Sequence, residues 1–358
     1  MKKAFCLAIS LLQITLSLFP LLASCENHTH TYDRSWQSDE THHWKIPTCG
    51  CDVISEYDKH ILGEDGFCIV CERALGESVG VEYAVSTDGK SAKTIDFFGY
   101  AGQTRVQVAS HYEGLPVTII GEDTFEGWDN LTTVVLPETV VEIGARAFQS
   151  CSALTDINLS EGLTKIGEVA FYGCTNLQRL DIPDTVTVID EFAFASCNKL
   201  QSVEIPQNIT VIERGVFNGC MNLSQVTIGE NVKTIGDSAF AHCRNLLSIK
   251  IPNGVAEIGE GAFNSCAGMN SIILPKTLTC VGDWAFDCIY EMVIYYEGKQ
   301  TDWSLVETGA GVIPIVYFYS ETEPALNADG TGYDGNYWRY VDGIPKVWEY
   351  EDDKQETF

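Results

Sequence analysis

The chain has 358 residues, 45% of them hydrophobic, which is enough to bury a large core. Its 22 basic and 50 acidic residues give a net charge of −28 at pH 7. A surface that binds nucleic acid needs clustered Lys and Arg, so this charge excludes nucleic acid as a partner.

Residues 1–24 have the pattern of an export signal. Lys2 and Lys3 precede a mostly apolar run over residues 4–23. The sequence LASC, ending at Cys25, resembles the lipobox of bacterial lipoproteins, whose cysteine is lipidated and becomes the mature N-terminus. This resemblance implies an exported protein at the bacterial cell surface, anchored to the membrane by acyl chains on Cys25. The alternative is an ordinary signal peptide that ends near a cysteine.

Residues 25–76 form a Cys- and His-rich region that could bind a metal ion. Two cysteine pairs, Cys49 with Cys51 and Cys68 with Cys71, are separated by 16 residues. Zn²⁺ takes four tetrahedral thiolate or imidazole ligands, so the pairs predict a zinc knuckle, in which His60 could replace Cys49 or Cys51. Disulfide bonds or unliganded thiols at these cysteines are the alternatives.

Residues 120–288 contain an internal repeat with a period of 23 residues. Phe recurs eight times at this spacing, with Ile or Val five residues before it, and in six units Cys lies three residues after it. The phenylalanines are Phe125, Phe148, Phe171, Phe194, Phe217, Phe240, Phe263 and Phe286. The cysteines are Cys151, Cys174, Cys197, Cys220, Cys243 and Cys266.

The pattern within each unit predicts two short strands and a helical turn. LQRLDIP alternates apolar and polar residues and stops at Pro183, so it predicts a strand, and VTVI, ending at Ile189, predicts a second. In EVAFYGC, the spacing of Ala170, Phe171 and Cys174 puts all three on one face of a helical turn. The residue before that turn is Asp or Glu in six of eight units, which suits the positive end of a helical turn.

One unit cannot fold alone, because four or five buried apolar side chains contribute roughly 6–15 kcal/mol. Ordering each residue costs about 1–2 kcal/mol, so the units must stack and share a core. The sequence therefore predicts a solenoid of about eight coils over 120–288. It is flanked by an N-terminal strand or cap segment at 77–119, a C-terminal cap at 289–320, and an aromatic, acidic tail at 321–358.

The consensus IGxxAFxxCxxLxxLxIPxxV resembles the bacterial surface protein A (BspA) type of leucine-rich repeat. The resemblance implies an α/β repeat solenoid, a right-handed leucine-rich repeat coil with a continuous parallel sheet. It also implies an exported cell-surface protein, some relatives being linked to adhesion or host-protein binding, and no shared enzyme activity. Four residues depart from the pattern and are expected to be tolerated: Ser160 and Gly229 replace the strand-ending Pro, and Asp190 and Glu213 replace Gly.

The cysteine of each repeat is expected to fill space in the core. Trp128 occupies the same position in the first unit, which indicates that the position requires an apolar side chain. Free Cys behaves as a small buried hydrophobe. Stacked cysteines would lie about 4.8 Å apart. That is within reach of a disulfide, but parallel Cβ vectors fit its geometry poorly.

The outward residues of the first strand form a candidate ligand face. They vary from coil to coil while the core residues repeat, and solenoid faces of this kind commonly bind proteins. The alternative is a merely solvated face. The candidate residues are Asn158, Arg179, Asp181, Glu204, Thr227 and Lys250.

Motifs of catalysis are missing from the sequence, which contains no nucleophile elbow, P-loop or dinucleotide-binding fingerprint. We therefore expect a non-enzymatic protein whose solenoid binds another macromolecule, a protein or a glycan on a host or neighbouring cell. The alternatives are a structural or envelope-associated module and a cell-wall or glycan-binding protein.

Overall fold

The computed structural model describes residues 37–38, 42–45, 55–59, 80–99, 102–287, 289, 291–311 and 314–350. The described strands β1–β3 belong to one compact unit, and residues 80–350 belong to another. In the first unit, β1 (Gln37–Ser38), β2 (His42–Lys45) and β3 (Ser55–Lys59) form an antiparallel sheet with β2 in the centre.

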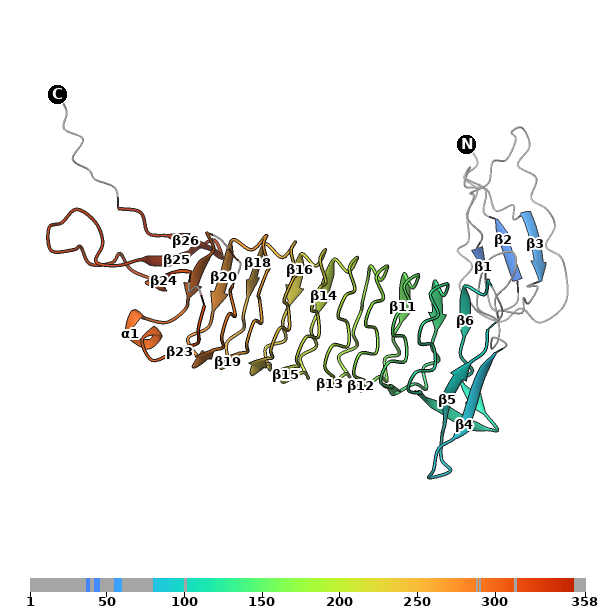
Figure 1. The fold of residues 1–358 in the computed structure, drawn as a ribbon. Helices are drawn as coiled ribbons and strands as arrows, with labels where there is room; N and C mark the ends of the chain where they lie inside the picture. The colour runs from blue at the N-terminus through green and yellow to red at the C-terminus, as the bar shows by residue number, and fades with distance from the viewer. Residues whose placement is uncertain are drawn as a thin grey trace, which may run out of the picture. The chain divides into compact units, whose positions relative to one another are not determined.

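The second unit is a parallel β-solenoid, in which most coils contribute a short strand to each of two ladders (Figure 1). Within the repeat, paired residues in both ladders are 23 apart, as in Val134 with Ile157 and Ile143 with Ile166. Ladder A contains β6 (Arg105–Gln107), β9 (Thr133–Val135), β11 (Asp156–Asn158), β14 (Ser202–Glu204), β16 (Gln225–Thr227), β18 (Ser248–Lys250), β20 (Ser271–Leu274), β22 (Val293–Tyr296) and β24 (Ile315–Tyr319). Ladder B contains β8 (Leu115–Ile120), β10 (Glu142–Ile143), β12 (Lys165–Ile166), β13 (Val188–Ile189), β15 (Val211–Ile212), β17 (Thr234–Ile235), β19 (Glu257–Ile258), β21 (Cys280–Val281) and β23 (Glu307–Thr308). Pairs with β6, β22, β23 and β24 have other spacings.

The solenoid has about ten coils rather than the predicted eight. Nine coils contribute a strand to ladder A, and one more coil, at 179–182, lies between β11 and β14. The count rises because β6 lies before the predicted solenoid, and β22 and β24 lie after it. The segments predicted as caps thus add coils of their own.

The core is a set of side-chain columns that run along the stack. Eight Phe rings stack with centroids 5.1–6.0 Å apart and planes within 12° of parallel. The six repeat cysteines are free thiols with no exposed surface, so their prediction as core residues is confirmed. Each of these thiols donates to a Phe carbonyl of the preceding coil, as Cys174 Sγ does to Phe148 O at 3.2 Å.

The predicted helical turn around each Phe is wrong. The residues two before and two after the Phe are left-handed, as Arg146 (φ 54°) and Ser150 (φ 61°) are around Phe148. Backbone N–H groups alternately close a tight turn within the coil and donate to the next coil. Cys151 N donates to Phe148 O within the turn, whereas Phe148 N donates to Ala170 O of the next coil at 2.8 Å. A pair of turns buries the same apolar residues as a helical turn, so the side-chain spacing could not separate the two.

Both ends of the stack are covered by other strands. At the start, β4 (Val81–Val85), β5 (Ala92–Phe97) and β7 (His111–Tyr112) extend ladder B, and Phe97 packs 5.1 Å from Phe125. At the other end, β25 (Tyr337–Val341) pairs with β24 and turns back into β26 (Ile344–Val347). Trp338 of this hairpin is fully buried, and its Nε1 donates to Tyr296 O at 3.0 Å.

Helix is scarce in the described residues, where α1 (Gln300–Trp303) has four residues. None of the described helices is long and apolar enough to cross a membrane.

Candidate functional site: the interrupted strand face

The six predicted ligand residues all lie on the outward face of ladder A or of the coil within it, and all six are exposed. Strand register places Asn158 beside Val135, and Glu204 beside Thr227. We call this surface the strand face. It combines acidic, basic and neutral polar side chains, whereas the inward face of the same strands is apolar.

Ladder A is interrupted in the middle of the strand face. In the continuously described stretch 102–287, residues 179–182 form no strand, and their backbone makes no hydrogen bond to either neighbouring coil. The inward residue here is Leu180, whereas the flanking strands have a β-branched residue, which favours an extended backbone. Those β-branched residues are Val134, Ile157, Val203, Val226, Ile249 and Ile272. A second interruption separates β16 from β18.

Ladder B is interrupted next to the same place, between β13 and β15. Elsewhere the residue after the ladder strand is Gly, because neighbouring coils approach closely; a Cβ on Gly167 would lie 2.7 Å from Ala145 N. Asp190 and Glu213 carry a Cβ at this position. Gly236 N bonds Ile212 O at 2.7 Å, but no equivalent bond joins Glu213 to the preceding coil within 102–287.

Ring distances along the Phe column do not follow this interruption. The rings of Phe194 and Phe217 are 5.8 Å apart, but those of Phe263 and Phe286 are 6.0 Å apart where ladder B is continuous. Asp190 N bonds Ile166 O at 2.9 Å, so the expectation of a neutral departure was wrong for Glu213 and not for Asp190. Ser160, in contrast, fits the Pro slot, because it is buried and its hydroxyl donates to the Val140 carbonyl.

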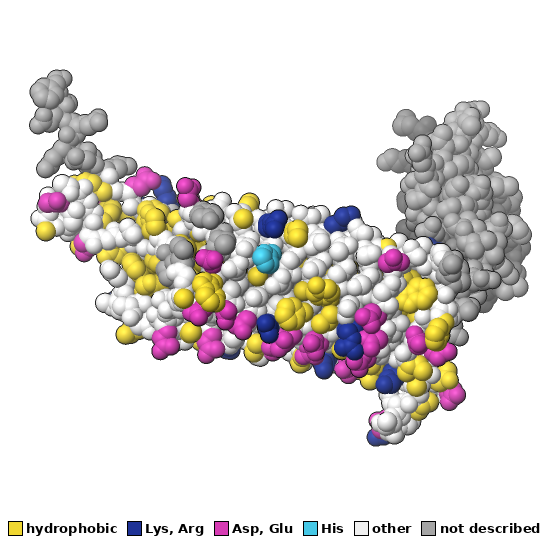
Figure 2. Space-filling view, in the orientation of Figure 1, with side chains coloured by type: hydrophobic (Ala, Val, Ile, Leu, Met, Phe, Trp, Pro, Cys, Tyr) yellow, Lys and Arg dark blue, Asp and Glu magenta, His cyan; other side chains and the backbone are white. Residues whose placement is uncertain are grey.

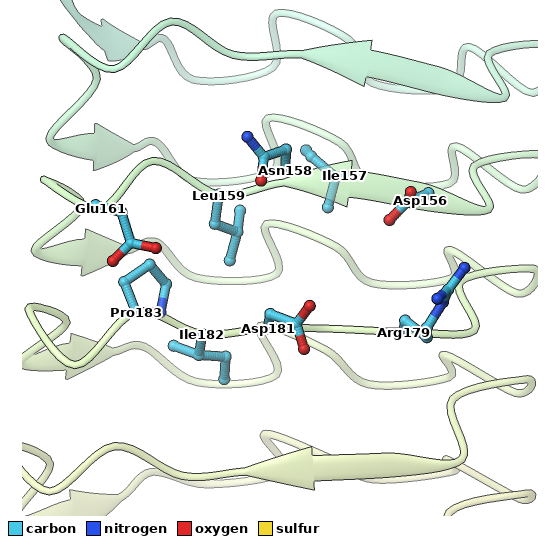
Figure 3. A pocket seen from close by; sticks show the side chains of 9 residues that line it. All are labelled: Asp156, Ile157, Asn158, Leu159, Glu161, Arg179, Asp181, Ile182 and Pro183. Carbon is cyan, nitrogen blue, oxygen red and sulfur yellow. The ribbon is translucent and has the colours of Figure 1, made fainter. Parts of the chain in front are cut away.

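The interruption opens a hollow of about 370 Å³ between β11 and the coil at 179–182 (Figure 3). Arg179 and Asp156 lie at one end, Asn158 and Asp181 at the centre, and Glu161 at the other end. Three carboxylates and one guanidinium give the hollow a net negative charge. Backbone groups of the unpaired coil are available there as further donors and acceptors.

A second hollow, of about 270 Å³, lies on the other side of the same coil. It is lined by Asp181, Glu204 and Thr227, together with apolar Ile182. Asp181 therefore belongs to both hollows. Five of the six predicted ligand residues line one hollow or the other.

Lys250, the sixth, has a different environment. Its Nζ lies 3.3 Å from Glu297 Oε1 and 3.4 Å from the hydroxyl of Tyr340, which itself donates to Glu297 at 2.7 Å. Tyr340 belongs to the C-terminal hairpin β25–β26. Lys250 thus marks the end of the open strand face, where the hairpin begins to cover it.

Carboxylates also gather along the ladder B edge, as Figure 2 shows on the side where β12 to β19 lie in Figure 1. Burial, and then the charges of Glu191 and Asp190, raise the pKa of Glu213. Asp237 Oδ1 accepts the backbone N–H of Glu260 at 2.8 Å, so it joins two coils. Asp237 and Glu260 are among the acids predicted to lie at the positive end of a helical turn. That prediction was wrong, because the turn is not helical.

The predicted lipid and zinc residues lie outside the described residues. They are Cys25, Cys49, Cys51, His60, Cys68 and Cys71. Within the described residues, no group of three or more His, Cys, Asp or Glu side chains is placed to hold a metal ion.

The repeats match the family model described as BspA type leucine-rich repeat region, with six copies over residues 118–247 and 233–297. These residues make up half of the chain. The chain belongs to the BspA-type leucine-rich repeat family. No curated protein matches the sequence.

The fold is shared with a solved leucine-rich repeat structure. A leucine-rich repeat protein from Bacteroides ovatus ATCC 8483 is 22% identical, with a TM-score of 0.58 over 67% of this chain and 69% of that one. A leucine-rich cell surface protein from Faecalibacterium prausnitzii A2-165 is 21% identical, with a TM-score of 0.43 over 66% of this chain and 98% of that one.

Sequence reasoning identified the exposed positions of this BspA-type repeat but missed the interruption. The sequence did contain signs of the interruption. Leu180 stands where the flanking strands have a β-branched residue, and Asp190 and Glu213 stand where the other coils have Gly. All three departures fall in two adjacent coils. Departures that cluster in one part of a repeat array would have indicated a local change in stacking.

Proposed function

We propose that this protein is a non-enzymatic, lipid-anchored cell-surface protein that binds another macromolecule through its strand face. The observation that carries the proposal is the interruption at 179–182, with a hollow on each side. Membership of the BspA-type family and the description of one similar structure as a cell surface protein are compatible with this role.

The charge of the strand face indicates the chemistry of the partner. Asp156, Glu161, Asp181 and Glu204 outnumber Arg179 around the two hollows. A partner surface that presents Lys and Arg side chains would be complementary, and the net charge of −28 would speed the encounter. We therefore favour a host or matrix protein with a basic surface.

A charge-reversal series tests this proposal. The mature chain is assayed against a panel of extracellular matrix proteins and glycans at low and physiological salt. Asp181→Lys with Glu204→Lys should weaken binding to the recognised protein by at least tenfold, and the wild-type affinity should fall with salt. Glu257→Lys with Glu307→Lys, an equal charge change on exposed residues of ladder B, is the matched control. Equal binding by all three proteins would rule out the strand face.

The membrane anchor is a separate part of the proposal. Acylation of Cys25 would tether the chain, and the Cys-rich region would follow directly after the lipid. Cells fed labelled palmitate should incorporate the label into the wild type and not into Cys25→Ala. A mature wild-type protein without lipid would support the ordinary signal peptide instead.

Zinc binding in residues 25–76 also remains a proposal. Cys49, Cys51, Cys68 and Cys71 would be the ligands, with His60 as a substitute for one of the first pair. Metal analysis of the chain purified without chelator should give about one zinc per molecule. A zinc content near zero would contradict zinc binding by this region.

A further inference from the structure

A third hollow lies on the turn side of the solenoid and shares no residue with the strand-face hollows. Its volume is about 330 Å³, and three adjacent coils contribute most of its wall. Its lining residues are Asn218, Ser238, Ala241, His242, Glu260, Gly261, Asn264, Trp284 and Asp287.

The hollow exists because side-chain size changes abruptly along one column of the repeat. The residue two before each Phe is small in two successive coils, Ser238 and Gly261, and is Trp284 in the next. The small residues leave an open floor, and Trp284 forms one wall. Trp284 is 47% exposed, although an indole is usually largely buried in a folded chain.

Polar groups converge on the same hollow. Glu260 and Asp287 supply carboxylates, Asn218 and Asn264 supply amides, and His242 supplies an imidazole. The side chains of Asn218, His242 and Glu260 make no hydrogen bond to any other described residue. These groups can therefore both donate and accept hydrogen bonds with a ligand.

We propose that this hollow binds a pyranose unit of a neutral glycan. An exposed indole offers an apolar face to the C–H groups of a sugar ring, while carboxylate and amide groups pair with the hydroxyls around the ring edge. The two carboxylates disfavour phosphate, sulfate and acidic sugars, because like charges repel. The hollow is open at the surface, so a chain of sugars can continue beyond the bound unit.

The experiment is affinity electrophoresis of the mature full-length chain in gels that contain one neutral polysaccharide each. The probes are amylopectin, xylan, mannan, mixed-linkage β-glucan and glycol chitin. At least one should retard the wild-type protein. Trp284→Ala should weaken that retardation by at least tenfold, and Glu260→Gln should weaken it by a smaller factor.

Matched controls keep a structural effect apart from a binding effect. Tyr172→Ala removes an exposed aromatic ring from the turn side of another coil, and Glu168→Gln alters the acid equivalent to Glu260. Both should bind as the wild type does, and all variants should keep the wild-type melting temperature within a few degrees. Failure of every probe to retard the wild type would overturn the proposal.

Unchanged retardation of Trp284→Ala would overturn it as well. So would a loss of retardation in the Asp181→Lys, Glu204→Lys variant with Trp284→Ala unaffected, since the glycan would then bind the strand face. The proposal does not depend on the strand-face proposal, and each can fail alone.

Discussion

Each ladder cysteine holds its thiol in a slot that water does not reach. Burial raises the pKa of Cys151, Cys220 and Cys266 from an ordinary value of 9.0 to about 12. The first unit has Trp128 in this slot, which is why the sequence alone was enough to assign the cysteines to the core. Their chemical inertness follows from the same burial.

The buried thiols predict a loss of stability at alkaline pH. Between pH 9 and about 12 the unfolded chain releases thiol protons that the folded chain retains, so the free energy of unfolding falls as pH rises. Each such thiol contributes about 1.4 kcal/mol per pH unit across this range. Melting curves from pH 7 to 11 should show the fall. Cys151→Ala with Cys220→Ala should have a shallower pH slope, and an identical slope would contradict the account.

Glu213 gives a prediction of the same sign, at mildly acidic pH. Its pKa is raised above 4.5 by burial and by Glu191 and Asp190, so its ionisation on going to neutral pH destabilises the fold. Glu213→Gln should therefore raise the melting temperature at pH 7 by about 1–3 °C. The difference should shrink as the pH falls toward 4.5, the ordinary pKa of a Glu side chain. Glu230→Gln, an exposed acid elsewhere in the stack, should show neither effect.

At the level of elements, we attribute the interruption of ladder A at 179–182 to Leu180; the one between β16 and β18 lies between strands with β-branched residues and has another cause. Leu180→Ile keeps the side-chain volume and introduces the β-branch that the flanking strands have, at a cost below about 1.5 kcal/mol. We expect the variant to form a strand at 179–182, close both strand-face hollows and lose partner binding. Leu177→Ile, a buried position outside the strand, is the control. If the variant forms the paired strand at 179–182 but still binds the partner as the wild type does, the interruption is not needed for binding.

The strands could be predicted from sequence, but the turns and interruptions could not. The run ending at Ile189 forms β13 as predicted, because strand pattern is local. The alternation ending at Pro183 marks the ladder A position of the repeat, but the strand predicted there was wrong for this coil, where 179–182 are unpaired. The turns were misassigned because Ala170, Phe171 and Cys174 are buried in either geometry. The interruptions depend on how closely the next coil approaches, which no single unit reveals.

On the scale of the whole solenoid, stability depends on covering the open ends of the stack. Trp338 is fully buried against Tyr295 and Tyr319, at ring distances of 5.3 Å each. Trp338→Ala should lower the free energy of unfolding by about 3–5 kcal/mol. Trp348→Ala, in a partly exposed position, should cost less. Equal losses in denaturant titrations would show that the hairpin does not cap the core.

The sequence predicted the solenoid and its exposed face, yet it did not reveal that the face is divided. The repeat fixes where Asn158, Asp181 and Glu204 lie relative to the core, whatever their identity. It does not fix how neighbouring coils pair, and the pairing is lost at the coils that carry Leu180 and Glu213. The binding surface therefore comes from departures from the repeat rather than from the repeat.

Hydrogen exchange of the mature chain, with and without the matrix protein it recognises, tests the strand-face account most directly. In the free protein, the backbone amides of 179–182 should exchange much faster than those of β11 and β14, because they lack ladder partners. Bound partner should slow the exchange at 179–182 and leave ladder B unchanged. Equal protection of 179–182 and its neighbours in the free chain, or no change on binding, would contradict the account.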